Sequence, residues 1–496
     1  MKAGRREWIG LAVLALPSLL VSIDVFVLLL ALPQITTDLG ASATQQLWIM
    51  DSYGFLLSGF LVTMGTLGDR IGRRKLLLIG AGAFTAASVL AAFAPTPGLL
   101  IAARALLGVA GATLAPSTLA LISNMFRDAR QRALAISVWM VCFLAGAAIG
   151  PLVGGVVLAH FWWGAVFLLC VPVMVLLLVA GPVLLPEYRS PDSGRLDLTS
   201  VALSLATILP AVYGLKELAK HGWQVVPVVL LALGVAFGFV FVRRQRVLPE
   251  PLLDLALFAG RAFRTALGNM LFGTMLMGAI MVFTTQYLQL VGGLTPLQAG
   301  LWMLPGVVAS VASSLLSPLL ARRFRPAYVI GIGLVVAVFG LVLVASASSV
   351  AAVAVGLTVI NLGAGPMVVL GTDLIIGSAP PSKAGSAASL NETCGELGFA
   401  LGIALLGSLG TAVYRAGVEV PAGVAAPDSL ASAVALAERL PIQVGTELLV
   451  SAREAFTTGM HVAAWVSAVL MAAVAAFVVP LLRHVRPSNE LVETAS

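Results

Sequence analysis

Six ionisable residues lie inside long apolar stretches of this sequence, and their chemistry is the first clue to function. They are five acids and one base: Asp24, Asp51, Arg104, Asp373, Glu392 and Glu396. A charge at the centre of a lipid bilayer costs about 2.5–3.5 kcal/mol on insertion scales, so such residues usually mark ion or substrate pathways. If the apolar stretches cross a membrane, these six positions are the primary site candidates.

Asp24 stands near the middle of the apolar stretch 9–33, and no basic residue is close to it in the sequence. Burial disfavours the charged form of a carboxyl group, so such a side chain readily takes up a proton. We interpret Asp24 as a site that holds either a proton or an organic cation. The alternative is a carboxyl group that is hydrogen-bonded for packing only.

The other charges suggest two pairs. Asp51 and Arg104 are expected at similar depth, a turn or two below the outer surface. There they would form an ion pair, and protonation of Asp51 would release Arg104. The alternative is a static ion pair between the two helices. Glu392 and Glu396 are four residues apart and share one helix face. Two neighbouring carboxylates resist joint ionisation, so one of them is expected to hold a proton.

The elements that must carry these residues are membrane-spanning helices. Of the 496 residues, 59% are hydrophobic and only 10% are charged, whereas soluble domains average about 25% charged residues. The apolar residues form blocks of about 20, the length of a transmembrane helix. We therefore expect an all-α integral membrane protein with fourteen spans, at residues 9–33, 46–67, 76–95, 98–124, 134–158, 161–185, 198–219, 224–242, 265–290, 297–321, 327–347, 349–378, 385–413 and 457–482.

The basic residues predict the orientation of these spans. If the N-terminus is cytoplasmic, 23 of the 29 lysines and arginines fall on the cytoplasmic side and five on the outer side. Because cytoplasmic loops are enriched in Lys and Arg, both termini are predicted in the cytoplasm. This asymmetry accounts for the net charge of +7 without a nucleic-acid partner.

A short internal repeat divides the chain. "LGDRIGRRKLLLIG" starts at Leu67, and "LARRFRPAYVIGIG" starts at Leu320. We interpret residues 1–196 and 247–496 as two six-helix bundles and residues 197–246 as an inserted helix pair. Two parallel halves around a central site are the plan of a rocking transporter; chance similarity between membrane segments is the alternative.

The connection 415–456 is the one long loop of the sequence, and it is predicted to be extracellular. Its segment "PDSLASAVALAERL" has an aspartate helix-start signal and helical spacing. We expect one or two short amphipathic helices there; a disordered loop is the alternative.

Four motifs now suggest a family. They are "GTLGDRIGRRK" from Gly65, "RALLGVAGA" from Arg104, "GAAIGPLVGG" from Gly146 and "GTDLIIGSAPPSKAGSAASLNETCGELG" from Gly371. Together they resemble the major facilitator superfamily, and within it the fourteen-span drug:proton antiporters that export quaternary ammonium compounds, dyes and fluoroquinolones. The resemblance covers nearly the whole chain. It implies the major facilitator fold and proton coupling at Asp51 and Arg104.

The first motif predicts a gate. Its glycines suit a tight turn and close packing. Asp69 is expected to face residues 383–388, where it would meet the positive end of a helix dipole and latch the halves at the cytoplasmic face. The alternatives are that the arginines set topology only and that "GAAIGPLVGG" is generic packing. Asp373 is interpreted as a gate or capping group, and the alternative is that it contacts substrate. The candidate gating residues are Gly65, Asp69, Arg70, Gly72, Arg73, Gly150, Pro151 and Asp373.

A central cavity for organic cations would need aromatic, polar and adaptable side chains. The candidates beside Asp24 and Glu392 are Phe26, Trp48, Tyr53, Trp139, Asn269, Met270, Phe283, Gln286, Tyr287 and Asn361. For each of these residues, lipid contact or core packing is the alternative.

The predicted function is export of lipophilic, mostly cationic compounds in exchange for protons by alternating access. The alternative is a proton-coupled transporter of a physiological metabolite. We expect no enzyme activity and no cofactor, because no G-x-x-x-x-G-K-[ST] phosphate loop occurs. The four histidines lack metal-site spacing, and the three cysteines lie in apolar runs. The expected partners are cationic drugs, protons and the lipid bilayer, and the expected state is a monomer.

Overall fold

The computed structural model describes residues 3–41, 43–189, 197–221, 224–248, 251, 253–380, 383–421, 424, 426–427, 429–483 and 485. Within these segments some helix residues are described by their backbone alone, and Phe26, Asp51 and Pro151 are among them. The regular elements of the described chain are all helical, so the predicted all-α class is confirmed.

The N-terminal half and the inserted pair form the first nine helices. They are α1 (Arg5–Leu39), α2 (Ala43–Ile71), α3 (Arg73–Ala92), α4 (Pro97–Met125), α5 (Ala129–His160), α6 (Ala165–Leu168), α7 (Cys170–Leu184), α8 (Leu198–His221) and α9 (Val225–Gln245). The remaining elements are η1 (Leu255–Ala259), α10 (Arg261–Gln286), η2 (Tyr287–Val291), α11 (Pro296–Leu320), α12 (Pro326–Ala345), α13 (Val350–Gly377), α14 (Ala384–Gly417), α15 (Leu430–Ala437) and α16 (Ile442–Leu482).

The predicted number of spans is only partly reproduced. By length and composition, the described residues contain 12 stretches that are long and apolar enough to cross a membrane. The two other predicted spans correspond to α2 and α5, which are helices of 29 and 32 residues. Every predicted span thus coincides with a helix, while the count of fourteen is not confirmed as such.

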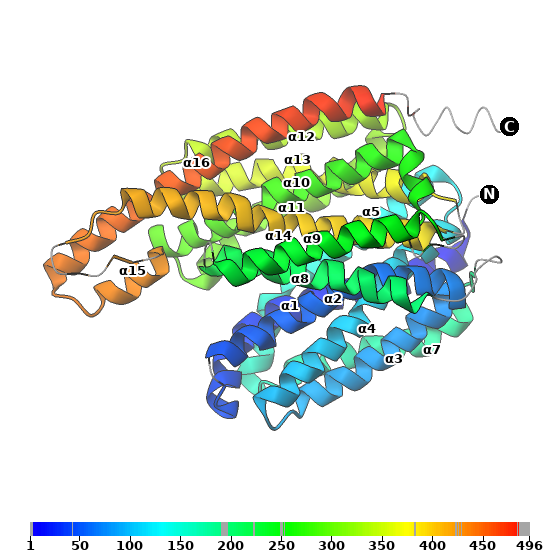
Figure 1. Cartoon of the computed structure of the whole chain (residues 1–496), viewed down its shortest axis with the longest axis horizontal. Coiled ribbons are helices and arrows are strands. Elements are labelled where there is room, and N and C mark those ends of the chain that lie inside the picture. The colour runs from blue at the N-terminus through cyan, green and yellow to red at the C-terminus, as the bar shows by residue number, and fades with distance from the viewer. Residues whose placement is uncertain are drawn as a thin grey trace.

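The helices pack around two main apolar cores. One core joins α1 to α7 and also includes Ile376, Ala384 and Ala388 from the opposite half. The other core joins α10, α12, α13, α14, α15 and α16. The inserted helices α8 and α9 pack on each other, and α8 also contacts α2 and α14 (Figure 1). The division into two bundles and an insert remains a prediction that this packing supports.

Glycines let α5 approach α1 closely. A methyl group at Gly146 would overlap the carbonyl of Leu19, and one at Gly154 would lie 2.9 Å from a methyl carbon of Val27. Small residues on one face allow two helices to pack at short distance in a membrane. The "GAAIGPLVGG" segment therefore serves helix packing in this structure, and its Gly150 is buried. The side chain of Pro151 lies outside the described residues.

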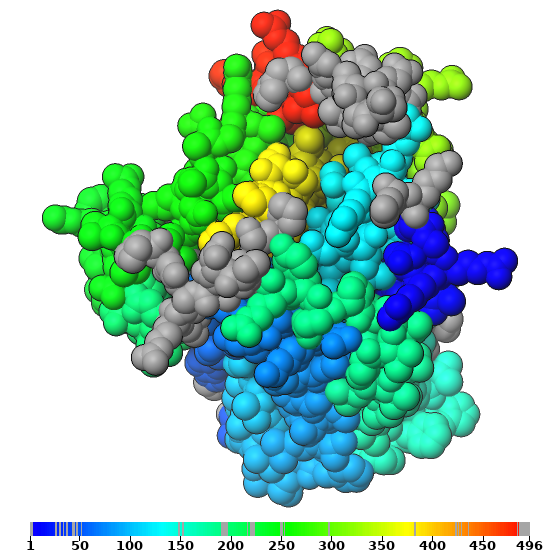
Figure 2. All heavy atoms as spheres, turned by 90° about the vertical axis from the view of Figure 1, so that its right-hand side faces the viewer, coloured from blue at the N-terminus to red at the C-terminus, as the bar shows by residue number. Residues whose placement is uncertain are grey.

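The arginine-rich connections gather at one end of the molecule. Arg6 donates to the carbonyl of Val183, Arg74 to that of Leu185 and Arg325 to that of Arg483. The start of α1 and the end of α16 lie at this same end, and α15 lies at the opposite end (Figure 1). Figure 2 views the arginine-rich end, where the end of α13 and the start of α14, in yellow, lie against the N-terminal half.

The last helix extends well beyond a bilayer. α16 has 41 residues, which at 1.5 Å per residue is about twice the roughly 30 Å of a hydrocarbon core. α15 packs against its outer part, so the predicted short helix in the long connection is confirmed. Its start differs from the prediction, because Ser429 caps the helix by accepting from the backbone of Ser432, where the sequence suggested an aspartate.

Candidate functional site

A buried charge cluster occupies the centre of the N-terminal half. Arg104 Nη1 of α4 donates to Asp24 Oδ2 of α1 at 2.6 Å, and Arg104 Nε donates to the carbonyl of Ile49 at 3.2 Å. The guanidinium carbon lies 4.7 Å from the ring centroid of Tyr53 on α2. Asp24 is 4% exposed and Arg104 is 1% exposed, so each charge depends on these partners in place of water.

This cluster corrects one expectation and leaves another open. The sequence suggested that Asp24 is unpaired, but the structure pairs it with Arg104. The two residues are 80 positions apart and meet only because α1 packs on α4, which sequence proximity cannot reveal. The side chain of Asp51 lies outside the described residues, so its predicted pair with Arg104 stays a prediction.

The contact predicted for Asp69 is present at the arginine-rich end of the molecule. Asp69 Oδ2 accepts from the backbone nitrogen of Ser386 at 3.2 Å and from its hydroxyl at 3.1 Å. Asp69 Oδ1 accepts from Arg73 Nε at 2.9 Å. Because α14 begins at Ala384, Asp69 lies at the positive end of this helix, as proposed from the sequence.

Arg73 lies inside this contact. Its side chain is fully buried, and it also donates to the carbonyl of Gly65. A methyl group at Gly65 would overlap Ser389 and would lie 2.9 Å from the carbonyl oxygen of Gly385. We call Gly65, Asp69, Arg73, Ser386 and Ser389 the α2–α14 latch. The latch explains why glycine stands at position 65, where α2 and α14 almost touch.

Gly72 has a different reason to be glycine. Its φ of 113° lies in a region that residues with a Cβ avoid, and it makes the turn between α2 and α3. A methyl group there would also lie 2.6 Å from Glu187 Oε1. Arg70, which the sequence placed with the gate, is buried at the end of α2.

A second ion pair joins the halves at the same end. Arg132 Nε of α5 lies 2.7 Å from Asp373 Oδ1 of α13, and both side chains are largely buried. The sequence identified Asp373 as a gate candidate but treated Arg132 as a topology signal. The partners are 241 positions apart, and only the packing of α5 on α13 brings them together.

The two glutamates continue the latch face of α14 towards the middle of the membrane. Ser389 is fully buried against α2, Glu392 is half-buried and Glu396 is exposed. Positions 389, 392 and 396 follow each other at helical spacing, so the α2–α14 seam is closed at Ser389 and opens towards Glu396. Asn391 Nδ2 donates to Glu392 Oε1 at 3.4 Å.

Several predicted lining residues are packed elsewhere in this structure. Trp139 donates to Thr118 at 3.2 Å inside the N-terminal half, and the Phe283 ring lies 5.7 Å from that of Phe456 inside the C-terminal half. Tyr287 is buried in η2. These three residues follow the core-packing alternative. Most apolar stretches here are apolar on every side, so sequence could not assign their faces.

The other candidates have mixed surroundings. Trp48 stacks on Tyr213 of the inserted pair, with ring centroids 6.1 Å apart. Asn361 donates to the carbonyl of Leu357 at 2.9 Å, and Gln286 is exposed. Asn269 is buried, and neither of its amide atoms has a hydrogen-bond partner in the described part of the chain.

Two further candidates complete the comparison with the sequence. Met270 is buried, and its terminal methyl carbon lies 3.4 Å from the position that a Cβ at Gly395 would occupy. The side chain of Phe26 lies outside the described residues. Within the described residues, no group of three or more His, Cys, Asp or Glu side chains is placed to hold a metal ion.

Comparisons with known proteins agree with this geometry. The sequence profile of the Major Facilitator Superfamily matches residues 14–403. The chain is 47% identical to "Multidrug efflux pump LfrA" of Mycolicibacterium smegmatis, over 95% of this chain and 96% of that protein. It is 33% identical to "Methyl viologen resistance protein SmvA" of Salmonella typhimurium, over 92% and 94%. The crystal structure of the human organic anion transporter MFSD10 superimposes with a TM-score of 0.61 at 14% identity, covering 94% of this chain and 99% of that one.

Proposed function

This chain belongs to the major facilitator superfamily, and on that premise we propose that it exports lipophilic, mostly cationic compounds in exchange for protons. Relatives named for multidrug efflux and methyl viologen resistance align with almost its full length. The observation that supports proton exchange best is the buried Asp24–Arg104 pair. The chain is a transporter in this proposal and needs no catalytic group or cofactor.

The Asp24–Arg104 pair supplies a group that responds to protons. While Asp24 is ionised, its charge compensates that of Arg104. Proton uptake at Asp24 removes this attraction and leaves the guanidinium, which stays charged at any physiological pH. A change of partners inside a bundle of packed helices favours a different packing, which is how proton binding shifts a conformational equilibrium.

The seam between the halves supplies the site for a cation. Glu392 and Glu396 extend from the closed latch into the open part of the seam. A carboxylate replaces part of the hydration that an organic cation loses there, and a proton that neutralises the carboxylate cancels the attraction. Competition between proton and drug for the same charge then couples their movements in opposite directions.

The two cytoplasmic contacts between the halves support alternating access. The α2–α14 latch and the Arg132–Asp373 pair both close the arginine-rich end. We propose that this state faces outward and that both contacts break when the site opens to the cytoplasm. Both carboxylate systems belong to one chain, which supports a monomer as the working unit.

Drug-dependent proton movement in liposomes tests the proposed function. Purified protein is reconstituted with a pH-sensitive dye trapped inside, and ethidium is added outside without a pH gradient. Exchange predicts that the lumen becomes more alkaline as ethidium enters, because protons leave in return, and that this change depends on the protein. Acidification of the lumen on ethidium uptake would indicate co-transport and would contradict the proposal. Ethidium uptake without any proton movement would contradict antiport.

We also propose that both termini face the cytoplasm of a bacterial cell, because 23 of the 29 basic residues fall on that side. Cysteines at Lys75 and Ile442, both exposed, can be placed in a chain whose native cysteines are replaced by alanine. An impermeant maleimide applied to whole cells is expected to label Ile442→Cys alone. Labelling of Lys75→Cys in intact cells would reverse the orientation.

Substrate charge is the next prediction. Glu392→Gln is expected to reduce export of divalent propidium more than that of monovalent ethidium, because a divalent cation uses a second carboxylate in the seam. Efflux of the matched dyes from cells measures the ratio. Glu447→Gln, an exposed acid on the outer part of α16, serves as the control. Equal loss for both dyes would limit Glu392 to proton binding.

A further inference from the structure

Tyr53 is the third partner of the buried Arg104, although the sequence suggested it only as a residue that lines a drug cavity. The ring centroid lies 4.7 Å from the guanidinium carbon, and Tyr53 itself is 4% exposed. A guanidinium over an aromatic face is attracted to the negative face of the ring, and the attraction grows when water is excluded. The position is therefore built for a cation–π contact and is not open to a drug in this structure.

We propose that Tyr53 is a positioning residue for proton exchange, because its ring holds Arg104 in place while Asp24 carries the proton. This inference rests on the proposed antiport function and names a residue that acts on the proton site through Arg104.

The partners of Arg104 explain why the ring matters in one state more than in the other. With Asp24 ionised, the guanidinium is compensated by a carboxylate at 2.6 Å. When Asp24 is neutral, two other groups among the described residues still stabilise the charge of Arg104. They are the carbonyl of Ile49 at 3.2 Å and the ring of Tyr53. The ring thus stabilises the protonated state more than the ion-paired state, in which the cation's charge is already compensated.

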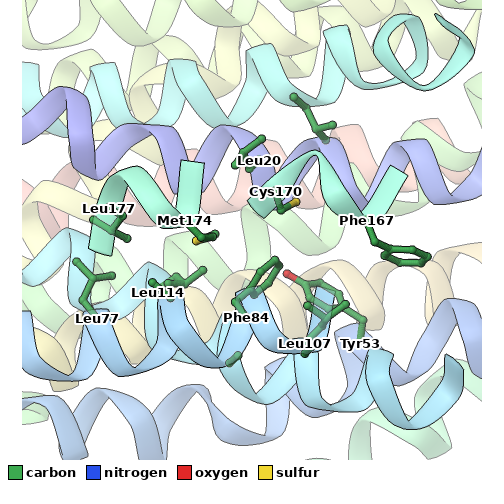
Figure 3. Packing of buried hydrophobic residues seen from close by; sticks show 14 of the residues in the cluster. Leu20, Tyr53, Leu77, Phe84, Leu107, Leu114, Phe167, Cys170, Met174 and Leu177 are labelled. Carbon is green, nitrogen blue, oxygen red and sulfur yellow. The ribbon is translucent and has the colours of Figure 1, made fainter. Parts of the chain in front are cut away.

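The phenol hydroxyl is a separate matter. It makes no hydrogen bond in the described part of the chain, and in Figure 3 it points towards the Cys170 side of the cluster. A hydroxyl without a partner is not required to position Arg104. The ring face is the functional feature, so phenylalanine at this position is expected to serve equally well.

Other charges also act on this position and must be held constant. The groups that act electrostatically on Tyr53 are Asp24 from α1, Arg104 from α4, Cys170 from α7 and Glu396 from α14. The side chain of Asp51, on the same helix, lies outside the described residues. Substituting Tyr53 alone changes none of these charges, so an altered pH response reports the ring.

The test compares Tyr53→Leu, Tyr53→Met and Tyr53→Phe. Initial rates of ethidium efflux are measured in proteoliposomes at pH values between about 5.5 and 9, in steps of about 0.5. The rates are normalised to the amount of protein present. Without the ring, proton uptake at Asp24 needs a higher proton concentration. The pH of half-maximal efflux in the Leu and Met variants is expected to fall by about 0.5–1 unit.

The Phe variant is expected to keep the wild-type pH profile, while the Met variant shifts. A purely structural role of Tyr53 would not predict this difference between the two variants. Phe126→Leu removes a buried ring of the same core, which packs on Trp8 near the start of α1, and is expected to change protein amount but not the profile. Profiles of Leu and Met that coincide with wild type, or a Phe profile that shifts with them, would overturn the inference. Absence of ethidium-dependent proton movement in the wild type would instead refute the proposed function.

Discussion

Asp24→Asn is expected to abolish proton-driven drug efflux and to lower the stability of the folded protein. Asparagine has the same shape but no charge, so Arg104 would stay buried without its carboxylate partner. Removing one member of a buried ion pair costs about 3–5 kcal/mol, since the other charge is left uncompensated. The readouts are resistance to ethidium, counter-flow of protons in liposomes and the midpoint of thermal unfolding.

Two further variants separate the loss of charge from the loss of stability. Asp24→Asn combined with Arg104→Gln removes both charges, so stability is expected to recover while proton-driven efflux stays absent. Asp38→Asn changes an exposed aspartate near the end of the same helix and is expected to match the wild type in both respects. Normal efflux by Asp24→Asn under a pH gradient would limit the pair to a structural role.

Gly65→Ala is expected to slow drug efflux by preventing closure of the arginine-rich end, where the α2–α14 latch lies. The added methyl group would overlap Ser389 and press on the carbonyl of Gly385. Overpacking of this kind costs about 1–3 kcal/mol, which shifts the equilibrium between closed and open forms by roughly 5- to 150-fold. Spin labels at Lys75 and Ser378, both exposed at this end, are expected to move apart.

A local rescue makes this prediction specific. Ser389→Gly removes the side chain that the new methyl group would meet, so the double variant is expected to regain part of the efflux and the shorter label distance. Gly82→Ala adds a methyl group to α3 where no atom lies within 4 Å, and it controls for changing a helix glycine. If Gly65→Ala transports normally with an unchanged label distance, the α2–α14 contact is not a gate.

Some of this account was predictable from the sequence. The apolar blocks and the distribution of arginines predict the helices and the end at which their connections gather. Asp69 was expected at the start of α14 from the spacing of its motif, and the structure places it there. These features depend on local composition or on a recurrent motif, and both are visible in a single chain.

The pairing of buried charges was not predictable. Asp24 meets Arg104 across 80 positions, and Arg132 meets Asp373 across 241. The packing of the helices decides which charges form pairs, and this packing cannot be predicted from a single sequence by inspection of its motifs. The core packing of Trp139, Phe283 and Tyr287 was not predictable for a related reason. Lipid and protein core are both apolar, so composition does not distinguish a residue that faces either from one that faces a cavity.

The central claim is that drug and proton compete for the same carboxylates, and proton release on drug binding measures this directly. Ethidium is added at about neutral pH to the purified wild-type protein in weakly buffered detergent solution, with a pH-indicator dye present. The account predicts that ethidium binding releases protons and that Glu392→Gln, which removes a carboxylate of the seam, releases fewer. Saturable ethidium binding with no release of protons at any pH between about 6 and 9 would contradict it.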